Sequence, residues 1–192
     1  DGTAVMEMAE AAGITLVSSE EKNPLYTTTY GVGEMICDAI KNGAKTFVIG
    51  IGGSATNDGG AGLLQALGFR LLDAEGRDIT RGGAGWAKLA KIEASNLKFQ
   101  LPDFKCQIAQ KGATPEMVKE LDAALGNFSR VASASIVSGM FGASGDASLY
   151  PGAGAAGGLG FAFKAFLNAE LVPGVDLILS ETRLEDFVRD AD

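Results

Sequence analysis

The part of the sequence best suited to chemistry is a run of small and polar residues that follows an apolar stretch. It reads Gly50-Ile51-Gly52-Gly53-Ser54-Ala55-Thr56-Asn57-Asp58-Gly59-Gly60. If a helix begins after it, the loop and the first helical turn offer unpaired N–H groups that can bind an anion. Asp58 is the best candidate carboxylate here. The same polar residues could instead only cap a tight strand-to-helix connection, with Asp58 in an Asx turn, and the pattern alone leaves both interpretations open.

The start of this run also matches a cofactor-binding pattern. Gly50-x-Gly52-x-x-Ala55 has the spacing of the dinucleotide fingerprint, and Asp73 lies at about the right distance along the chain to bind a ribose hydroxyl. An NAD(P)-binding oxidoreductase domain is therefore an alternative function. Against it, Asn57-Asp58-Gly59-Gly60 places a charge and two glycines where the helix of the fingerprint should begin. A Walker A loop is excluded here, because no Gly-Lys-Ser/Thr follows.

A second glycine-rich run, Gly152-x-Gly154-x-x-Gly157, has the same spacing. Pro151 precedes it directly and no convincing strand leads into it. A helix that packs very closely on a neighbouring element uses the same small residues. We therefore favour close packing over ligand binding for this run.

A third candidate is the lysine in Gln110-Lys111-Gly112-Ala113, which stands just before Thr114-Pro115-Glu116. A capping residue, a proline and an acid in this order are typical of a helix start. Lys111 could contact a phosphate as a point charge, although a single lysine before a helix is more often solvated.

The elements that must position these residues alternate between helix and strand. The run 45–51 has the length and composition of a parallel strand buried on both faces. Thr28 or Thr29 can cap a helix that ends near Asn42-Gly43, and the pattern from Ala61 to Leu67 is helical. This alternation predicts an α/β fold with a mixed sheet flanked by helices.

Further elements complete the sequence-based prediction. Strands are expected at 3–8, 69–72, 104–109 and 175–179, and helices after Thr114, over 157–171 and over 180–188. The stretch 127–145 is rich in small residues and predicts only a loose helix followed by a loop. Trp86 and the set Phe161, Phe163 and Phe166 are expected in the core.

Composition narrows the class of function. The chain has 192 residues, no histidine and a formal charge of −8. Without histidine it cannot itself form Ser-His-Asp or Cys-His nucleophile systems. The negative charge disfavours sequence-independent nucleic-acid binding and docking on an anionic membrane. Two distant cysteines and the lack of a signal-peptide pattern favour a reducing, cytoplasmic location.

Several motifs together identify a known family. The order of Asn23-Pro24-Leu25, Tyr30-Gly31-Val32-Gly33-Glu34, the Gly50–Gly60 run, Gln110-Lys111-Gly112-Ala113 and the Gly152–Gly160 run resembles the bacterial glycerate kinases that make 2-phosphoglycerate. The long Gly-Gly-Ser-Ala-Thr-Asn-Asp-Gly-Gly match is the most specific of these, and the motifs cover nearly the whole chain.

The resemblance implies ATP-dependent phosphorylation of D-glycerate, with ATP and Mg²⁺ as cofactors, at a cleft between two α/β domains. It implies that Asp58 is catalytic, orienting Mg²⁺ or the acceptor hydroxyl. The residues expected to bind substrate or nucleotide are Gly52, Gly53, Ser54, Thr56, Asn57, Gly59, Gly60 and Lys111. No nucleic acid or membrane is expected as a partner.

Departures from the family pattern also carry information. The family's Pro-Asp-Ser-Phe-Lys, Asp-Gly-Gly-Glu-Gly-Thr and Thr-Gly-Glu-Gly-Arg motifs are absent. Ala109 is followed directly by Gln110, where the family has a further stretch. Residues 1–192 are therefore expected to form the central domain, with outer-domain segments missing at both ends. A non-catalytic isolated domain is the third alternative, and its exposed former interface could support a homodimer.

Overall fold

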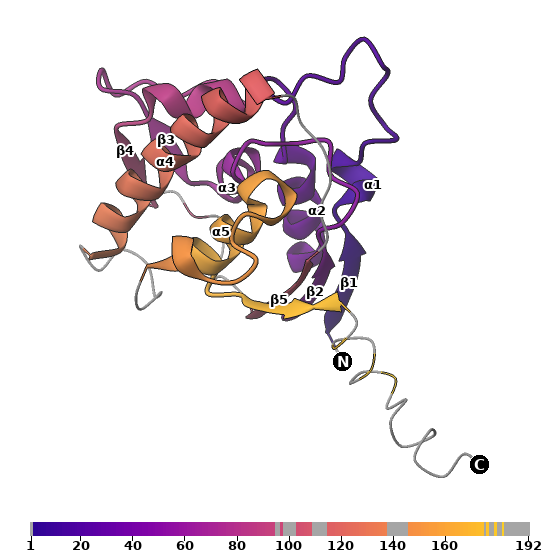
Figure 1. Ribbon diagram of the computed structural model, residues 1–192. Helices are drawn as coiled ribbons and strands as arrows, with labels where there is room; N and C mark the ends of the chain where they lie inside the picture. The colour runs from indigo at the N-terminus through magenta and orange to yellow at the C-terminus, as the bar shows by residue number, and fades with distance from the viewer. Residues whose placement is uncertain are drawn as a thin grey trace.

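The fold is described from a computed structural model that covers most of the chain. It describes residues 2–94, 97, 103–108, 115–137, 146–174, 176, 179 and 182. For 103–108, 115–122 and 135–137 the description is limited to the backbone. Helices and strands alternate along the chain, which confirms the predicted α/β class (Figure 1).

The elements follow one another in a simple order. They are β1 (Thr3–Glu7), α1 (Ala9–Ala12), α2 (Tyr30–Lys41), β2 (Thr46–Gly50), α3 (Ala61–Leu67), β3 (Arg70–Leu72), the 3₁₀ turn η1 (Gly83–Lys88), β4 (Lys91–Glu93), β5 (Asp103–Ile108), α4 (Pro115–Val137), the 3₁₀ turn η2 (Ala147–Leu149), α5 (Ala155–Leu167) and β6 (Glu170–Pro173).

The described strands form two sheets. The main sheet has the order β1-β2-β5-β6, and every neighbouring pair in it is parallel. Strands β3 and β4 form a separate antiparallel pair. The parallel and antiparallel pairings expected of one mixed sheet are thus divided between two sheets. The register brings Glu7, Gly50 and Gln107 into one row where β1, β2 and β5 approach their carboxyl ends.

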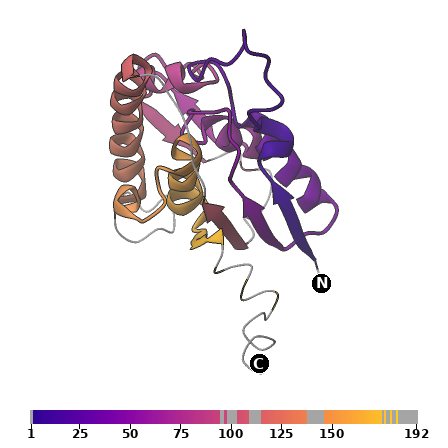
Figure 2. The same ribbon diagram turned by 45° about the vertical axis from the view of Figure 1, so that its right-hand side comes forward.

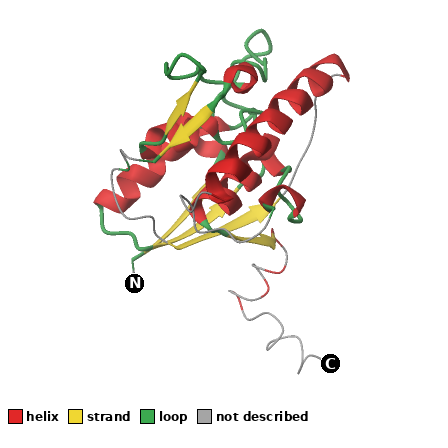
Figure 3. Cartoon of the chain, turned by 90° about the vertical axis from the view of Figure 1, so that its left-hand side faces the viewer, coloured by secondary structure: helices red, strands yellow, loops and turns green. Residues whose placement is uncertain are grey.

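All three crossovers of the main sheet step in the same direction, from β1 towards β6. Right-handed connections that step in one direction place their helices on one face of the sheet. Helices α2, α3 and α5 accordingly lie on one side of the main sheet (Figures 1 and 2), and Figure 3 shows helices gathered on that side of its strands. On the opposite face, Thr3, Val5 and Glu7 of β1 are exposed. Thr46 and Val48 of β2 are only half-buried, so the prediction that this strand is buried on both faces is wrong for the described residues.

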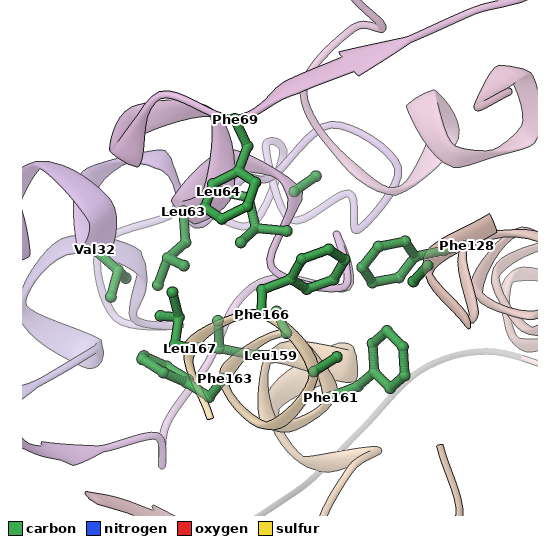
Figure 4. Packing of buried hydrophobic residues seen from close by; sticks show 14 of the residues in the cluster. Val32, Leu63, Leu64, Phe69, Phe128, Leu159, Phe161, Phe163, Phe166 and Leu167 are labelled. Atoms are coloured by element: carbon green, nitrogen blue, oxygen red, sulfur yellow. The ribbon is translucent and has the colours of Figure 1, made fainter. Parts of the chain in front are cut away.

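The core lies between the main sheet, its helices and α4. Phe128 of α4 stacks on Trp86 of η1, with ring centroids 3.8 Å apart, and meets Phe161 edge-on at 4.9 Å. Phe166 bridges this group to Phe69, 5.7 Å away (Figure 4). The predicted burial of Trp86, Phe161, Phe163 and Phe166 is confirmed. Aromatic packing therefore attaches α4 and the β3–β4 pair to the parallel half of the molecule.

Some predicted elements differ from those found. The helix expected over 157–171 ends at Leu167, because Asn168 adopts a left-handed conformation, and Glu170–Pro173 pairs with β5 instead. The loose helix expected from 127 is instead the regular continuation of α4 to Val137, and the loop expected after it, over 138–145, lies outside the described residues. Of the strand predicted at 175–179 the structure describes only Asp176 and Leu179, and both are helical, so the prediction is wrong for these residues. The helix at 180–188 is described only at Thr182, which is helical.

Close packing of α2 on α3 depends on Gly33. A Cβ at this position would lie 2.6 Å from Cβ of Ala66 and 2.7 Å from the carbonyl oxygen of Leu63. Both atoms belong to α3, and one is backbone, so little can move aside. The two helices can therefore approach this closely only if residue 33 has no side chain.

We predict that Gly33→Ala lowers the free energy of unfolding by about 1–3 kcal/mol, the usual cost of overpacking. Gly126→Ala is the matched control, because this glycine lies in α4 with nothing within 4 Å of an added Cβ. The control should raise stability by up to about 1 kcal/mol through helix propensity. Urea denaturation of both variants measures the difference, and equal effects at the two sites would contradict the assigned packing.

Candidate functional site

The Gly50–Gly60 loop lies at the carboxyl end of the parallel sheet. It leaves β2 at Gly50 and enters α3 at Ala61, as the sequence predicts. The amide of Met8, just after β1, donates to the carbonyl of Gly50 at 2.8 Å. The carboxyl edge of a parallel sheet is where open α/β folds bind their ligands.

A neighbouring segment supports the loop from the side. The amide of Ile14 donates to Gly53, and that of Ala55 donates to Ala12, at 2.8 and 2.9 Å. The hydroxyl of Thr27 donates to the carbonyl of Ala55 at 2.8 Å. The chain from α1 to the start of α2 therefore fixes the outer half of the loop.

The predicted binding residues separate into an accessible group and a buried group. Gly52, Gly53, Ser54 and Asn57 are at least partly exposed, whereas Thr56, Asp58, Gly59 and Gly60 are buried. In the described part of the chain, the amides of Gly52 and Gly53 have no acceptor. Gly53 adopts φ +69°, which turns the backbone sharply at the exposed end of the loop. The accessible group is thus the part of the loop that can contact a ligand.

Asp58 is completely buried and accepts hydrogen bonds from five donors. Its Oδ2 accepts from the amide and hydroxyl of Thr29, at 2.7 and 3.0 Å, and from the hydroxyl of Thr28 at 3.1 Å. The amide of Gly62 also reaches Oδ2, and that of Gly60 reaches Oδ1, both at 3.1 Å. One carboxylate therefore ties the first residues of α2 to the first turn of α3.

Thr29 completes this connection without capping its own helix. It occupies the N-cap position of α2, as predicted, yet its hydroxyl donates to Asp58 and accepts from the amide of Leu63 in α3 at 3.0 Å. The sequence favoured a local cap because a cap needs only the residues of one helix. The bond to α3 depends on how the two helices pack.

The burial of Asp58 affects both its charge and its role. Burial raises the pKa of the carboxyl above its ordinary value, and the bonds from Thr29, Gly62 and Gly60 offset part of that rise. Its oxygens face donors of the chain itself. The catalytic and metal-binding roles predicted for Asp58 remain predictions, and the geometry favours a positioning role.

Ser54 and Thr56 interact with each other. Their hydroxyl oxygens lie 2.9 Å apart, and the amide of Thr56 donates to Oγ of Ser54 at 2.9 Å. The side chain of Ser54 thus closes a local turn in the loop. Its partial exposure still leaves it beside the accessible amides.

The second glycine-rich run packs on the first through Gly157 and Gly158, so the close packing favoured by the sequence is confirmed at these residues. The amide of Gly59 donates to the carbonyl of Gly157 at 2.9 Å. Gly157 adopts φ +64°, and a Cβ there would collide with the carbonyl of Thr56 and with Cα of Asn57. This end of the second run therefore packs against residues 56–59 of the loop.

Trp86 also holds this loop in place. Its indole N–H donates to the carbonyl of Asp58, and the amide side chain of Asn127 donates to the carbonyl of Trp86 at 2.9 Å. Trp86 is completely buried. Helix α4 is thereby linked to the loop through one indole ring.

The structure does not support the dinucleotide interpretation. Asp73 lies in the turn after β3 of the separate antiparallel pair, and its carboxylate binds the guanidinium of Arg77 at 2.9 Å. In the fingerprint the corresponding acid follows a strand of the same parallel sheet as the glycine loop. Asp73 is therefore engaged in its own turn.

Lys111 and its neighbours 109–114 lie outside the described residues. Among the residues that are described, no group of three or more His, Cys, Asp or Glu side chains gathers to hold a metal ion. No helix in that same part of the chain is long and apolar enough to span a membrane.

One carboxylate at this edge was missed by sequence reasoning. Glu7 ends β1 and is paired in register with Gly50, and it is exposed. The alternation of apolar and polar residues over 3–8 predicts a strand, but it does not indicate which strand pairs with it. Only the pairing of β1 with β2, two segments far apart in sequence, places Glu7 beside the loop.

We predict that Asp58→Asn changes how stability depends on pH. Since the pKa of the wild-type carboxyl is raised by burial, the folded state binds a proton more readily than the unfolded chain. Wild-type stability relative to the variant should therefore decrease as the pH rises from about 4 to 7. Urea denaturation across this range measures the effect.

Asp73→Asn is the control of opposite sign. Hydrogen bonds from Arg77, the backbone amide first, lower the pKa of the Asp73 carboxyl. Its contribution is therefore lost as the pH falls below about 4, so the wild-type advantage should increase with pH there. The same sign of slope at both positions would refute the assigned environment of Asp58.

Comparison with known proteins agrees with the resemblance inferred from the motifs. The model of the glycerate kinase family matches residues 1–109 and 108–192. The chain is 43% identical to a glycerate kinase of Halalkalibacterium halodurans and 41% identical to a glycerate 2-kinase of Escherichia coli K12, and each alignment covers 98% of this chain. Nothing in these matches supports an oxidoreductase.

A solved structure gives the same result. A crystal structure from Salmonella typhimurium LT2, assigned as a glycerate kinase 2, superposes with a TM-score of 0.87 at 39% identity. The superposition covers 99% of this chain and 54% of the solved chain. The two curated relatives are covered to 53% and 52%. The chain thus spans about half the length of the proteins that it matches.

The family match is divided where the interior departure was expected. Its two parts meet at residues 108–109, and the alignment with the Halalkalibacterium relative has 208 positions against the 192 residues of this chain. A stretch missing after Ala109 would produce this difference. On both sides of that point the match continues to the ends of the sequence, and the chain belongs to the glycerate kinase family.

Proposed function

We propose that this chain carries the phosphate-binding loop of a glycerate kinase and takes part in transferring the γ-phosphoryl group of ATP to D-glycerate. The observation that carries the proposal is the accessible pair of amides at Gly52 and Gly53, at the carboxyl edge of a parallel sheet. The product would be 2-phosphoglycerate, and one of the similar proteins is named glycerate 2-kinase.

The chemistry of the loop fits an anionic ligand. Phosphoryl transfer is catalysed mainly by positioning and by stabilising negative charge, and backbone amides held in a rigid loop do both. The described edge offers such amides together with the hydroxyl of Ser54 and the side chain of Asn57. These four residues are the proposed contacts for phosphate or for the glycerate carboxylate.

Rigidity of the loop comes from the residues beneath it. The carboxylate and the carbonyl of Asp58 are bonded to Thr29 and Trp86 inside the molecule. Only the polar groups nearer the exposed end of the loop are therefore proposed to face a ligand. Donors fixed before the ligand arrives need little reorganisation when charge develops on it. We assign Asp58 a positioning role on this basis, and Lys111 stays a proposed phosphate contact from the motif alone.

ATP is the proposed phosphate donor, with Mg²⁺ as its metal ion. Mg²⁺ is usually held by one or two carboxylates together with substrate phosphates, so no dedicated cluster of acids is required. When bound, Mg²⁺ would neutralise charge on the phosphates of the nucleotide. A cytoplasmic location is proposed from the reducing setting that the two separated cysteines favour.

We predict that Gly53→Ala lowers kcat/KM for D-glycerate phosphorylation about tenfold or more, since a displaced donor to a developing anion commonly costs this much. The added methyl forces strain at φ +69° and lies on the accessible side of the loop. A coupled assay of ADP release measures the rate. The nearest atom to the new Cβ is Cβ of Ala9 at 3.4 Å, so the fold should tolerate the change.

Gly76→Ala is the matched control. Gly76 adopts φ +78° in the turn that follows β3, and nothing lies within 4 Å of an added Cβ. It carries the same backbone strain away from the loop and should leave kcat/KM nearly unchanged. Equal losses in both variants would indicate general destabilisation, and no ADP release by the wild-type chain would overturn the proposed function for these 192 residues.

A further inference from the structure

The carboxylate of Glu7 lies next to the start of the Gly50–Gly60 loop. It is the last residue of β1 and pairs with Gly50, the last residue of β2. Two residues beyond Gly50, the accessible amides begin. Glu7 belongs to the exposed face of the sheet, opposite α2 and α3, together with Thr3 and Val5.

The carboxylate of Glu7 occupies the space that a side chain at position 50 would fill. A Cβ built on Gly50 would collide with both carboxylate oxygens of Glu7. The absence of a side chain at Gly50 thus lets the carboxylate lie over an inner strand of the sheet, at the point where the loop begins. The hydrogen bond from Met8 to Gly50 holds the backbones together at this place.

No positive charge balances this carboxylate within the described part of the chain. None of the ion pairs or hydrogen bonds formed there involves the side chain of Glu7. A carboxylate next to a loop that binds phosphate would repel its ligand. A divalent cation between the two removes this repulsion, because it binds carboxylate and phosphate oxygens at the same time.

We propose that Glu7 is the carboxylate that binds the divalent cation of the metal–nucleotide complex. This inference rests on the proposed function, since it assumes that the loop binds nucleotide phosphates. Glu7 approaches the cation from β1, while the amides of Gly52 and Gly53 approach the phosphates from the loop. Gly50 is required between them because any side chain would displace the carboxylate.

The test is calorimetric titration of ADP into the 192-residue chain, once with Mg²⁺ and once with EDTA. Glu7→Gln should weaken binding of Mg·ADP by roughly tenfold or more, which corresponds to the loss of one charged ligand. Binding of metal-free ADP should be unchanged or tighter, because a repulsive charge is gone. A purely structural role of Glu7 would weaken both.

Two further variants sharpen the result. Glu34→Gln removes the same charge from an exposed position of α2 and should leave both titrations unchanged. Glu7→Asp keeps the charge but shortens the side chain, and should weaken only the Mg·ADP complex. This second variant decides the question if Glu7→Gln does not fold, which its thermal unfolding curve would reveal.

The outcomes separate this inference from the proposed function. If the wild-type chain binds ADP in either titration, the loop proposal stands and the Glu7 variants decide the metal assignment. Equal weakening of both titrations by the Glu7 variants, or no change in either, would overturn the role of Glu7 alone. If wild type binds no ADP under any of these conditions, the proposed function fails together with the inference.

Discussion

The buried carboxylate of Asp58 is the interaction on which the rest of the site depends. A charge inside a protein is tolerated only when donors surround it, and here they come from the starts of two helices. Because α2 and α3 share this acceptor, their first turns are fixed relative to each other. The loop before α3 is fixed with them, and its outer amides, at Gly52 and Gly53, have no acceptor in the described part of the chain.

Glycines act in this structure mainly by letting backbones approach. Gly157 and Gly60 bring α5 against the loop, and Gly33 brings α2 against α3. Two glycine-rich runs that each match a ligand-binding pattern thus have different roles. The Gly50–Gly60 run offers amides to a ligand, whereas the Gly152–Gly160 run packs against it. The sequence separates them only through the strand that precedes the first run and is missing before the second.

Much of the fold is predictable from local pattern, and what is not depends on pairing between distant segments. Helix α3, strand β2 and the start of α4 at Pro115 follow from periodicity and capping residues. The first two residues of β6, Glu170 and Leu171, were predicted as the end of the preceding helix, because the apolar pattern of α5 continues into them, and only the pairing with β5 reveals the strand. At the site, the loop was predictable, whereas the inward direction of Asp58 and the position of Glu7 follow from tertiary packing.

The central claim is that the outer amides of the loop contact nucleotide phosphate while the inner ones stay bonded to the chain. Backbone amide NMR shifts, recorded while Mg·ADP is added, test this most directly. The account predicts large shifts for Gly52 and Gly53 and small ones for Gly60 and Gly62, which donate to Asp58. Shifts confined to residues away from 50–60, or stronger at Gly60 and Gly62 than at Gly52 and Gly53, would contradict it.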